Sequence, residues 1–144
     1  MTTKSKLFLI ILVSASFSSL AFAQDHSVKQ SSPEAVVRAY TDAANRHDLE
    51  GFLALYAPDI RKFRFPGELA SQGIEHNRDV YTKSFAAAPN LKIEIVSMIS
   101  LNDKVMVHDR VTGRPDGKIA DELTVYQVQN GKITNIVYVE QTVG

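Results

Sequence analysis

Two aspartates are the residues of this sequence whose spacing most suggests chemistry. Asp109 lies in segment 104–112 and Asp121 in segment 118–129, and both segments alternate apolar with polar residues as β-strands do. If they form a hairpin with its loop at 113–117, the two aspartates lie opposite each other on an apolar face. Two carboxyl groups in one apolar site cannot both ionise cheaply, so one pKa is expected to be raised. Such a pair can act as general acid and general base.

The same pattern is compatible with a purely structural role for these aspartates. Like charges placed directly opposite each other destabilise a sheet. A register shift of one residue, or a bulge at Pro115, would move both carboxylates to solvent, and Arg61 or Arg114 could neutralise them. The catalytic and the structural interpretation therefore both stay open at this point.

The opposite face of this hairpin carries a histidine. In the expected register His108 lies across from Glu122, and a histidine oriented by a carboxylate can act as a base. The face is otherwise polar, so a solvated cross-strand pair, or a contact at a subunit interface, is the alternative interpretation.

Aromatic residues are the main candidates for a binding site. Tyr40 and Tyr81 fall on the apolar stripes of two expected helices, where a buried hydroxyl needs a partner or a ligand. For any one aromatic residue, packing in the core is the simpler alternative. We expect the binding residues to be Phe63, Phe65, Tyr81, His108 and Tyr126.

Metal and cofactor sites have no clear signal in this chain. His26, His47 and His76 do not pair at ligand spacing, and the chain has no cysteine, so we expect no metal site. Phosphate loops and dinucleotide-binding motifs are missing from the sequence, and we expect no cofactor.

The elements that must position these residues are helices followed by a sheet. Serines, a proline and a glutamate at 31–34 predict the start of a helix over 33–46. A shorter helix capped by Asp48 and ended by Pro58 follows, and a third is expected over 74–87. Strands are expected at 60–65, 91–100, 104–112, 118–129 and 132–141, with a hairpin turn at Asn130-Gly131.

The resulting fold class is α+β. Three N-terminal helices pack on a curved antiparallel sheet, and the first strand lies between the second and third helices. A bent sheet covered by helices on one face tends to leave a cavity at its open mouth.

The N-terminal segment is typical of an export signal. Lys4 and Lys6 precede an apolar run, and Ala21-Phe22-Ala23 has the form of a cleavage site. We expect residues 1–23 to be a signal peptide, with an uncleaved anchor as the minor alternative. Residues 24–31 are then a flexible leader and 32–144 the folded domain, exported to a periplasm or secreted.

The charge composition of the chain indicates which kinds of partner it can bind. Without the signal the chain has 121 residues, enough for one domain with a real core, and carries 14 basic and 16 acidic residues. It has no basic run, so we expect neither a nucleic acid nor, after signal cleavage, a membrane as partner.

Several segments together resemble one family. These segments are Arg38-Ala39-Tyr40, Asn45 to Leu49, Leu55 to Asp59, Phe65-Pro66-Gly67 and Asn130 to Ile133. They are similar to the SnoaL-like members of the NTF2-like superfamily, which includes the ketosteroid isomerases. The resemblance covers about residues 32–141 and implies a conical α+β barrel with an apolar pocket, often dimeric. The resemblance does not predict a particular reaction, because proteins with this fold have many functions.

The isomerase resemblance implies three catalytic roles. Tyr40 matches the tyrosine on the first helix that donates to an oxyanion. A protonated acid late in the sheet falls at Asp121 or Glu122. The carboxylate base on the first strand has no counterpart, since Arg64 or Phe65 occupies that position.

We therefore expect a small-molecule pocket protein. Its ligand would be a small apolar organic molecule, and any reaction would be isomerisation, dehydration or hydrolysis by acid–base chemistry, with Asp109, Asp121 and Tyr40 as catalytic residues. The alternative is a non-catalytic binding or assembly module of the same fold. A homodimer is implied by the resemblance.

Overall fold

The first helix begins at the serine–proline signal of the sequence. In the computed structural model, which describes residues 31–144, helix α1 spans Pro33–Asn45. The hydroxyl of Ser32 accepts a hydrogen bond of 3.2 Å from the N–H of Ala35, so it caps the first turn. The expected signal peptide (1–23) and residues 24–30 of the leader lie outside the described residues.

The other two helices are also close to their expected positions. Helix α2 spans Leu49–Leu53 and is capped by Asp48, whose carboxylate accepts from the N–H of Gly51 at 2.9 Å. Helix α3 spans Ile74–Ala87, as predicted. Pro58 does not end α2, because the chain has already entered a strand at Tyr56, which pairs with Ile133.

The sheet has six strands where five were expected. They are β1 (Tyr56–Arg64), β2 (Glu68–Gln72), β3 (Lys92–Leu101), β4 (Lys104–Thr112), β5 (Ala120–Gln129) and β6 (Lys132–Val143). The missed strand, β2, forms a hairpin with β1 across a cis Phe65–Pro66 bond. Its residues are largely exposed, so no apolar alternation marks it in the sequence.

The strand order is β2-β1-β6-β5-β4-β3. All neighbouring pairs are antiparallel except β1 and β6, which run parallel. The predicted α+β fold class is therefore confirmed, with the correction that the sheet is mixed and mostly antiparallel.

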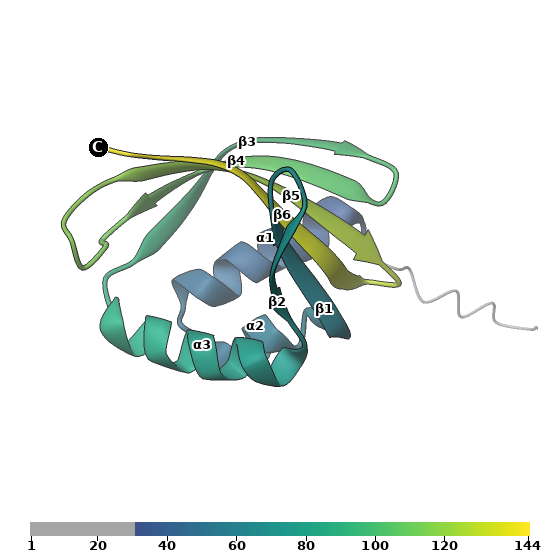
Figure 1. Cartoon of the computed structure of the whole chain (residues 1–144), viewed down its shortest axis with the longest axis horizontal. Helices are drawn as coiled ribbons and strands as arrows, with labels where there is room; N and C mark the ends of the chain where they lie inside the picture. The colour runs from purple at the N-terminus through teal and green to yellow at the C-terminus, as the bar shows by residue number, and fades with distance from the viewer. Residues whose placement is uncertain (1–30) are drawn as a thin grey trace, which may run out of the picture.

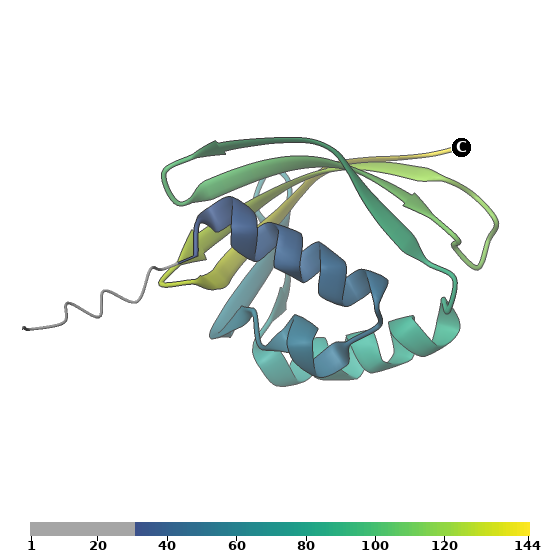
Figure 2. The ribbon, with the colours of Figure 1, turned by 180° about the vertical axis from the view of Figure 1, so that it is seen from behind.

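The helices cover one side of the curved sheet. In Figures 1 and 2 the sheet arches over α1, while α3 runs across the open end beside α2. Apolar side chains of α1, α2 and the inner strand faces form the core, with Val37, Phe52, Ile60 and Ile133 almost fully buried. Within residues 31–144, no helix is both long and apolar enough to cross a membrane.

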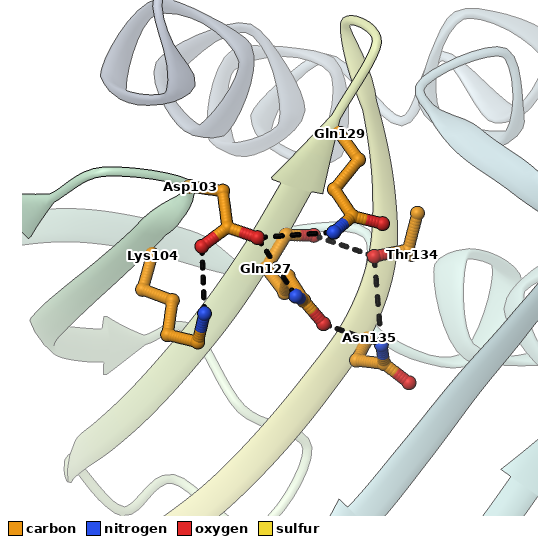
Figure 3. Close-up of polar contacts among 6 residues, drawn as sticks. All are labelled: Asp103, Lys104, Gln127, Gln129, Thr134 and Asn135. Atoms are coloured by element: carbon orange, nitrogen blue, oxygen red, sulfur yellow. Dashed lines mark hydrogen bonds and ion pairs between the residues drawn. The ribbon is translucent and has the colours of Figure 1, made fainter.

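A polar cluster on the outer side of the sheet ties three strands together (Figure 3). Asp103, in the β3–β4 turn, accepts hydrogen bonds from Lys104, Gln127 and Gln129. The Lys104 ammonium and the two amides lower the pKa of Asp103 to about 2. Asn135 of β6 donates to Gln127 at 2.7 Å, which extends the cluster beside an irregularity in the β5–β6 pairing. The cluster therefore holds the register of β5 where the ladder is interrupted.

Two glycines of the β4–β5 loop allow a test of how closely the loops pack. Gly113 and Gly117 both have positive φ, at 68° and 72°. A Cβ at Gly113 would lie 1.9 Å from the Asn90 carbonyl oxygen, whereas one at Gly117 would meet nothing within 4 Å.

We therefore expect Gly113→Ala to lower the free energy of unfolding much more than Gly117→Ala. The conformational cost of about 1 kcal/mol is shared by both variants, and the clash at Gly113 should bring its loss to about 3 kcal/mol or more. Urea denaturation of both variants measures the difference. Equal losses would show that the 88–91 segment does not pack against Gly113 in solution.

Candidate functional site

A cavity of about 300 Å³ lies between the helices and the concave face of the sheet. Its walls are mostly apolar or aromatic, with contributions from all three helices and from strands β3 to β6. The side chains that carry polar groups into it are those of Tyr40, Thr41, Tyr81, Ser84, Asp109, Arg114, Glu122, Thr124, Tyr126 and Tyr138. An apolar cavity with a few polar groups is the usual form of a small-molecule site.

Two carboxylates meet in the wall of this cavity, but they are not the two expected. Asp109 of β4 lies directly opposite Glu122 of β5 in the hairpin ladder. Asp109 is 4% exposed, and its Oδ1 atom is buried without a hydrogen-bond partner within residues 31–144. Glu122 is half-buried and accepts a hydrogen bond from Gln141. A buried polar atom without a partner is costly, so a ligand group that supplies a proton would stabilise it.

The surroundings of Asp109 favour its protonated form. Burial raises the pKa of Asp109 to about 6, the negative charge of Glu122 adds to the increase, and His108 offsets part of it. A carboxyl group with such a pKa exchanges protons readily near neutral pH, which suits a general acid or base.

The predicted register of this hairpin was wrong by one residue. Val111 pairs with Ala120, so the loop extends over 113–119. Ile119 exchanges two backbone hydrogen bonds of 3.1 Å with Gly144, which extends the pairing with β6 beyond Ala120. Asp121 therefore points outward, away from Asp109, and lies opposite Arg110.

The outward-facing aspartate forms its own cluster. A carboxylate oxygen of Asp121 lies 3.0 Å from Nε2 of His108 and 3.2 Å from a guanidinium nitrogen of Arg110. His108 thus meets Asp121 and not Glu122, and it lies outside the cavity. This arrangement matches the alternative interpretation of His108 as a cross-strand pair on the polar face.

The face of β1 that points inward was also mispredicted. Phe63 and Phe65 do not line the cavity, and Phe65 is 65% exposed beside an outer groove. The inward positions are those of Ile60 and Lys62. From the sequence, either the even-numbered or the odd-numbered residues of this segment could face the core. The apolar Ile60, two residues before Lys62, is the signal that favours the even-numbered residues, as observed.

Three of the expected aromatic residues do lie in the cavity wall. These are Tyr40, Tyr81 and Tyr126, and Tyr138 of β6 joins them although it was not singled out from the sequence. The hydroxyls of Tyr40 and Tyr56 share a hydrogen bond of 2.9 Å. Burial raises the pKa of Tyr40, Tyr56, Tyr126 and Tyr138.

Lys62 is the functional candidate that the sequence did not reveal. Its side chain is 4% exposed, and its Nζ donates a hydrogen bond of 2.9 Å to the hydroxyl of Tyr81. The same nitrogen lies 4.8 Å from the ring centroid of Tyr56 and 4.4 Å from that of Tyr81. Ammonium groups are attracted to aromatic faces at these distances.

The arginine in the cavity wall is already paired. Arg114 makes two hydrogen bonds to the carboxylate of Asp116, of 3.1 and 2.9 Å. As for metals, no three His, Asp or Glu side chains in the part of the chain that the structure describes are grouped as ligands. The chemistry that the cavity offers is proton exchange, through its carboxyl groups and phenols.

The raised pKa of Asp109 makes a prediction about stability. An aspartate in the unfolded chain has a pKa of about 3.9, so the folded protein holds this proton more tightly. The stabilisation is complete below about pH 4 and is lost as the pH rises through about 6. The Asp109→Asn variant has no carboxyl group at this position and should not lose this stability. The free energy of unfolding of the variant minus that of wild type should therefore increase by about 2 kcal/mol between pH 4 and pH 8.

Urea denaturation of both proteins at several pH values measures how this difference in free energy of unfolding changes with pH. Asp42→Asn is a matched control, because Asp42 is exposed on α1. Parallel curves for wild type and Asp109→Asn would contradict a raised pKa at this position.

Solved structures show the same fold in other proteins. A cystatin-fold protein from Novosphingobium aromaticivorans has 22% identity and a TM-score of 0.70, over 76% of this chain and 99% of that one. A proposed ketosteroid isomerase from Kribbella flavida has 19% identity and a TM-score of 0.62, over 74% and 76%. A computationally designed 17-OHP binder has 20% identity and a TM-score of 0.64, over 79% and 100%.

At these identities the likeness shows the fold alone, and among the curated proteins nothing matches the chain. The sequence itself matches the SnoaL-like domain over residues 37–136, which includes most of α1 and most of the sheet. The chain therefore belongs to the SnoaL-like family and has the NTF2-like, ketosteroid isomerase-like fold.

Proposed function

We propose that this protein binds a small, largely apolar organic molecule in its cavity and transfers a proton on it. The observation that carries the proposal is the position of Asp109. Its carboxyl group lies in an apolar wall, faces Glu122, and has an oxygen with no hydrogen-bond partner within residues 31–144. Isomerisation, dehydration and hydrolysis all need such a proton donor and acceptor.

The residues divide into two roles in this proposal. Asp109 exchanges the proton with the ligand, and burial together with the negative charge of Glu122 keeps the pKa of Asp109 raised. Phenols in the same wall stabilise negative charge that develops on a ligand oxygen. Tyr40 is the candidate for this donor that the family resemblance implies, and it lies in the cavity wall.

A second candidate function is binding without chemistry. The observation that favours it is the lack of a carboxylate on β1, since Arg64 or Phe65 occupies the position at which the isomerase resemblance requires a base, and the buried ionisable residue of this strand is Lys62. The similarity to a designed 17-OHP binder also fits this alternative, because that protein is a binder of the same fold. The two candidates share the ligand class and differ only in proton transfer.

Deuterium incorporation distinguishes the two functions. A panel of small cyclic ketones is first screened for binding by thermal shift, and bound ketones are then incubated with the protein in D₂O. The mass of the recovered ketone reports exchange of its α-protons. We expect catalysed exchange with wild type and a 10²- to 10⁴-fold slower rate with Asp109→Asn, the range that general acid–base catalysis contributes.

The control variant is Asp42→Asn, whose carboxylate is exposed on α1 and should leave the exchange rate unchanged. Binding of ketones by wild type without any exchange would support the binding module. Exchange that survives in Asp109→Asn would remove this residue from the mechanism.

We also propose that the protein works outside the cytosol, on the basis of its N-terminal sequence. The exported chain is expected to begin at Gln24, after the Ala21-Phe22-Ala23 site. Intact-mass measurement of the protein recovered from the periplasm or medium tests this. A mass that retains residues 1–23 would instead indicate an uncleaved anchor.

A homodimer remains a proposal that rests on the family resemblance. The outer surface of β3 would suit such a contact, since Ile99 and Leu101 are 69% and 76% exposed.

A further inference from the structure

A buried cation, Lys62, lies behind the cavity wall in contact with Tyr81. Lys62 is enclosed by core residues, and no Asp or Glu within residues 31–144 lies within ion-pair distance of its Nζ. Burial of an ammonium without a carboxylate is expensive and lowers the pKa of Lys62. The group that receives its hydrogen bond is the phenol of Tyr81, 2.9 Å away.

This hydrogen bond determines what Tyr81 can do. The phenol oxygen accepts from Lys62, so the single hydroxyl proton of Tyr81 is left to donate elsewhere. Tyr81 lines the cavity, whereas the Lys62 side chain lies behind it, outside the cavity wall. The proton of Tyr81 is therefore the means by which the positive charge of Lys62 can act on a ligand.

Tyr81 also differs electrically from the phenols around it. Burial alone would raise the pKa of Tyr81, but the charge and hydrogen bond of Lys62, together with the neighbouring phenols, outweigh burial, and the net pKa is lowered. The hydroxyls of Tyr40 and Tyr138 act in the same direction as Lys62. An acidic phenol is a strong hydrogen-bond donor, so Tyr81 is better suited than Tyr40 to bind an oxygen with negative charge.

We propose that Tyr81, positioned and polarised by Lys62, binds the oxygen of the ligand, and that the ligand is an apolar molecule with a phenol- or enol-type hydroxyl. The inference rests on the proposed function in that it takes the cavity to hold an organic ligand. It names the ligand class and the residue that recognises it. Lys62 is a positioning residue in this proposal, because Tyr81 lies between it and the ligand.

The observations favour this oxygen chemistry over a carboxylate. A carboxylate has two charged oxygens and binds best to two parallel donors, as an arginine provides. Arg114 in the cavity wall is occupied by Asp116, and Tyr81 offers one donor backed by one charge. A phenolate or enolate presents a single charged oxygen on a flat apolar body, which fits a narrow cavity lined by aromatic rings.

The test uses a series of para-substituted phenols of similar size and graded acidity, with 4-nitrophenol as the chromogenic member. The neutral analogues are the matching anisoles. We expect the affinity of wild type at neutral pH to increase with the acidity of the phenol. Loss of a charge-assisted hydrogen bond costs about 1.5–3 kcal/mol, so Lys62→Met and Tyr81→Phe should bind the most acidic phenols about 10- to 150-fold more weakly.

A spectroscopic readout separates recognition from mere structural support. The visible absorbance of bound 4-nitrophenol shows whether it is phenol or phenolate. We expect wild type to bind the phenolate at a pH at which the free compound is largely neutral, and both variants to lose this shift. Lys83→Met is the matched control, since Lys83 is exposed on α3, the same helix as Tyr81.

Folding of the variants is not expected to limit the experiment. Lys62→Met replaces a buried charge by an apolar side chain of similar length, a change that is often neutral or stabilising. Tyr81→Phe keeps the ring contacts with Phe52 and Phe85 and removes only the hydroxyl.

Two failures can be told apart. If wild type binds anisoles as tightly as the acidic phenols, or if both variants bind phenols like wild type, the oxygen site at Tyr81 is wrong while the cavity remains a ligand site. If neither anisoles nor phenols bind, the proposed small-molecule function fails, and this inference fails with it.

Discussion

The pairing of β4 with β5 determines which ionisable groups meet inside this protein. Side chains alternate between the two faces of a strand, so a shift of one residue in one strand exchanges every side chain of that strand between core and surface. The observed register places Asp109 and Glu122 together in the cavity wall and leaves Asp121 outside with His108 and Arg110. The charge pattern of the cavity therefore depends on the register between these two strands.

A cation lies behind one part of the cavity wall, and an acid lies in another part of it. Strands β6 and β5 lie between β1, which carries Lys62, and β4, which carries Asp109. At about 4.8 Å per strand, β1 and β4 lie about 14 Å apart across the sheet. Lys62 is level with Val105 of β4 in the ladder, so Asp109 lies four residues further along that strand. A ligand that spans the cavity would have its oxygen end near Tyr81 and its other end near Asp109. The two ends would then meet groups of different charge, which orients the ligand.

The fold was largely predictable from the sequence, because each main element has a local signal. Capping by Ser32 and Asp48, the Asn130-Gly131 turn and the apolar stripes of α1 gave correct helix and hairpin positions. The exposed strand β2 and the parallel pairing of β1 with β6 have no such signal, since they depend on which segments meet in three dimensions.

The site was harder to predict for the same physical reason. Tyr40, Tyr81 and Tyr126 were identified because large apolar rings on helix stripes and strands tend to be buried. Asp121 and Phe63 were placed on the wrong faces, because a loop longer by two residues and a second frame of alternation both fit the pattern. Lys62 was missed because a lysine is normally exposed, and only the aromatic rings of Tyr56 and Tyr81 explain its burial.

The buried lysine also changes where a base can be. The isomerase resemblance implies a carboxylate base on the first strand, at the position of Arg64 or Phe65 in this chain, and a donor to the ligand oxygen at Tyr40. Here the buried ionisable residue of the first strand is Lys62, whose charge beside Tyr81 favours an anionic oxygen and disfavours a proton acceptor nearby. The available carboxyl group lies across the cavity on β4, opposite Glu122. A reaction in this protein would therefore bind the oxygen at β1 and α3 and move the proton at β4 and β5, an arrangement in which the two functions lie on opposite sides of the ligand.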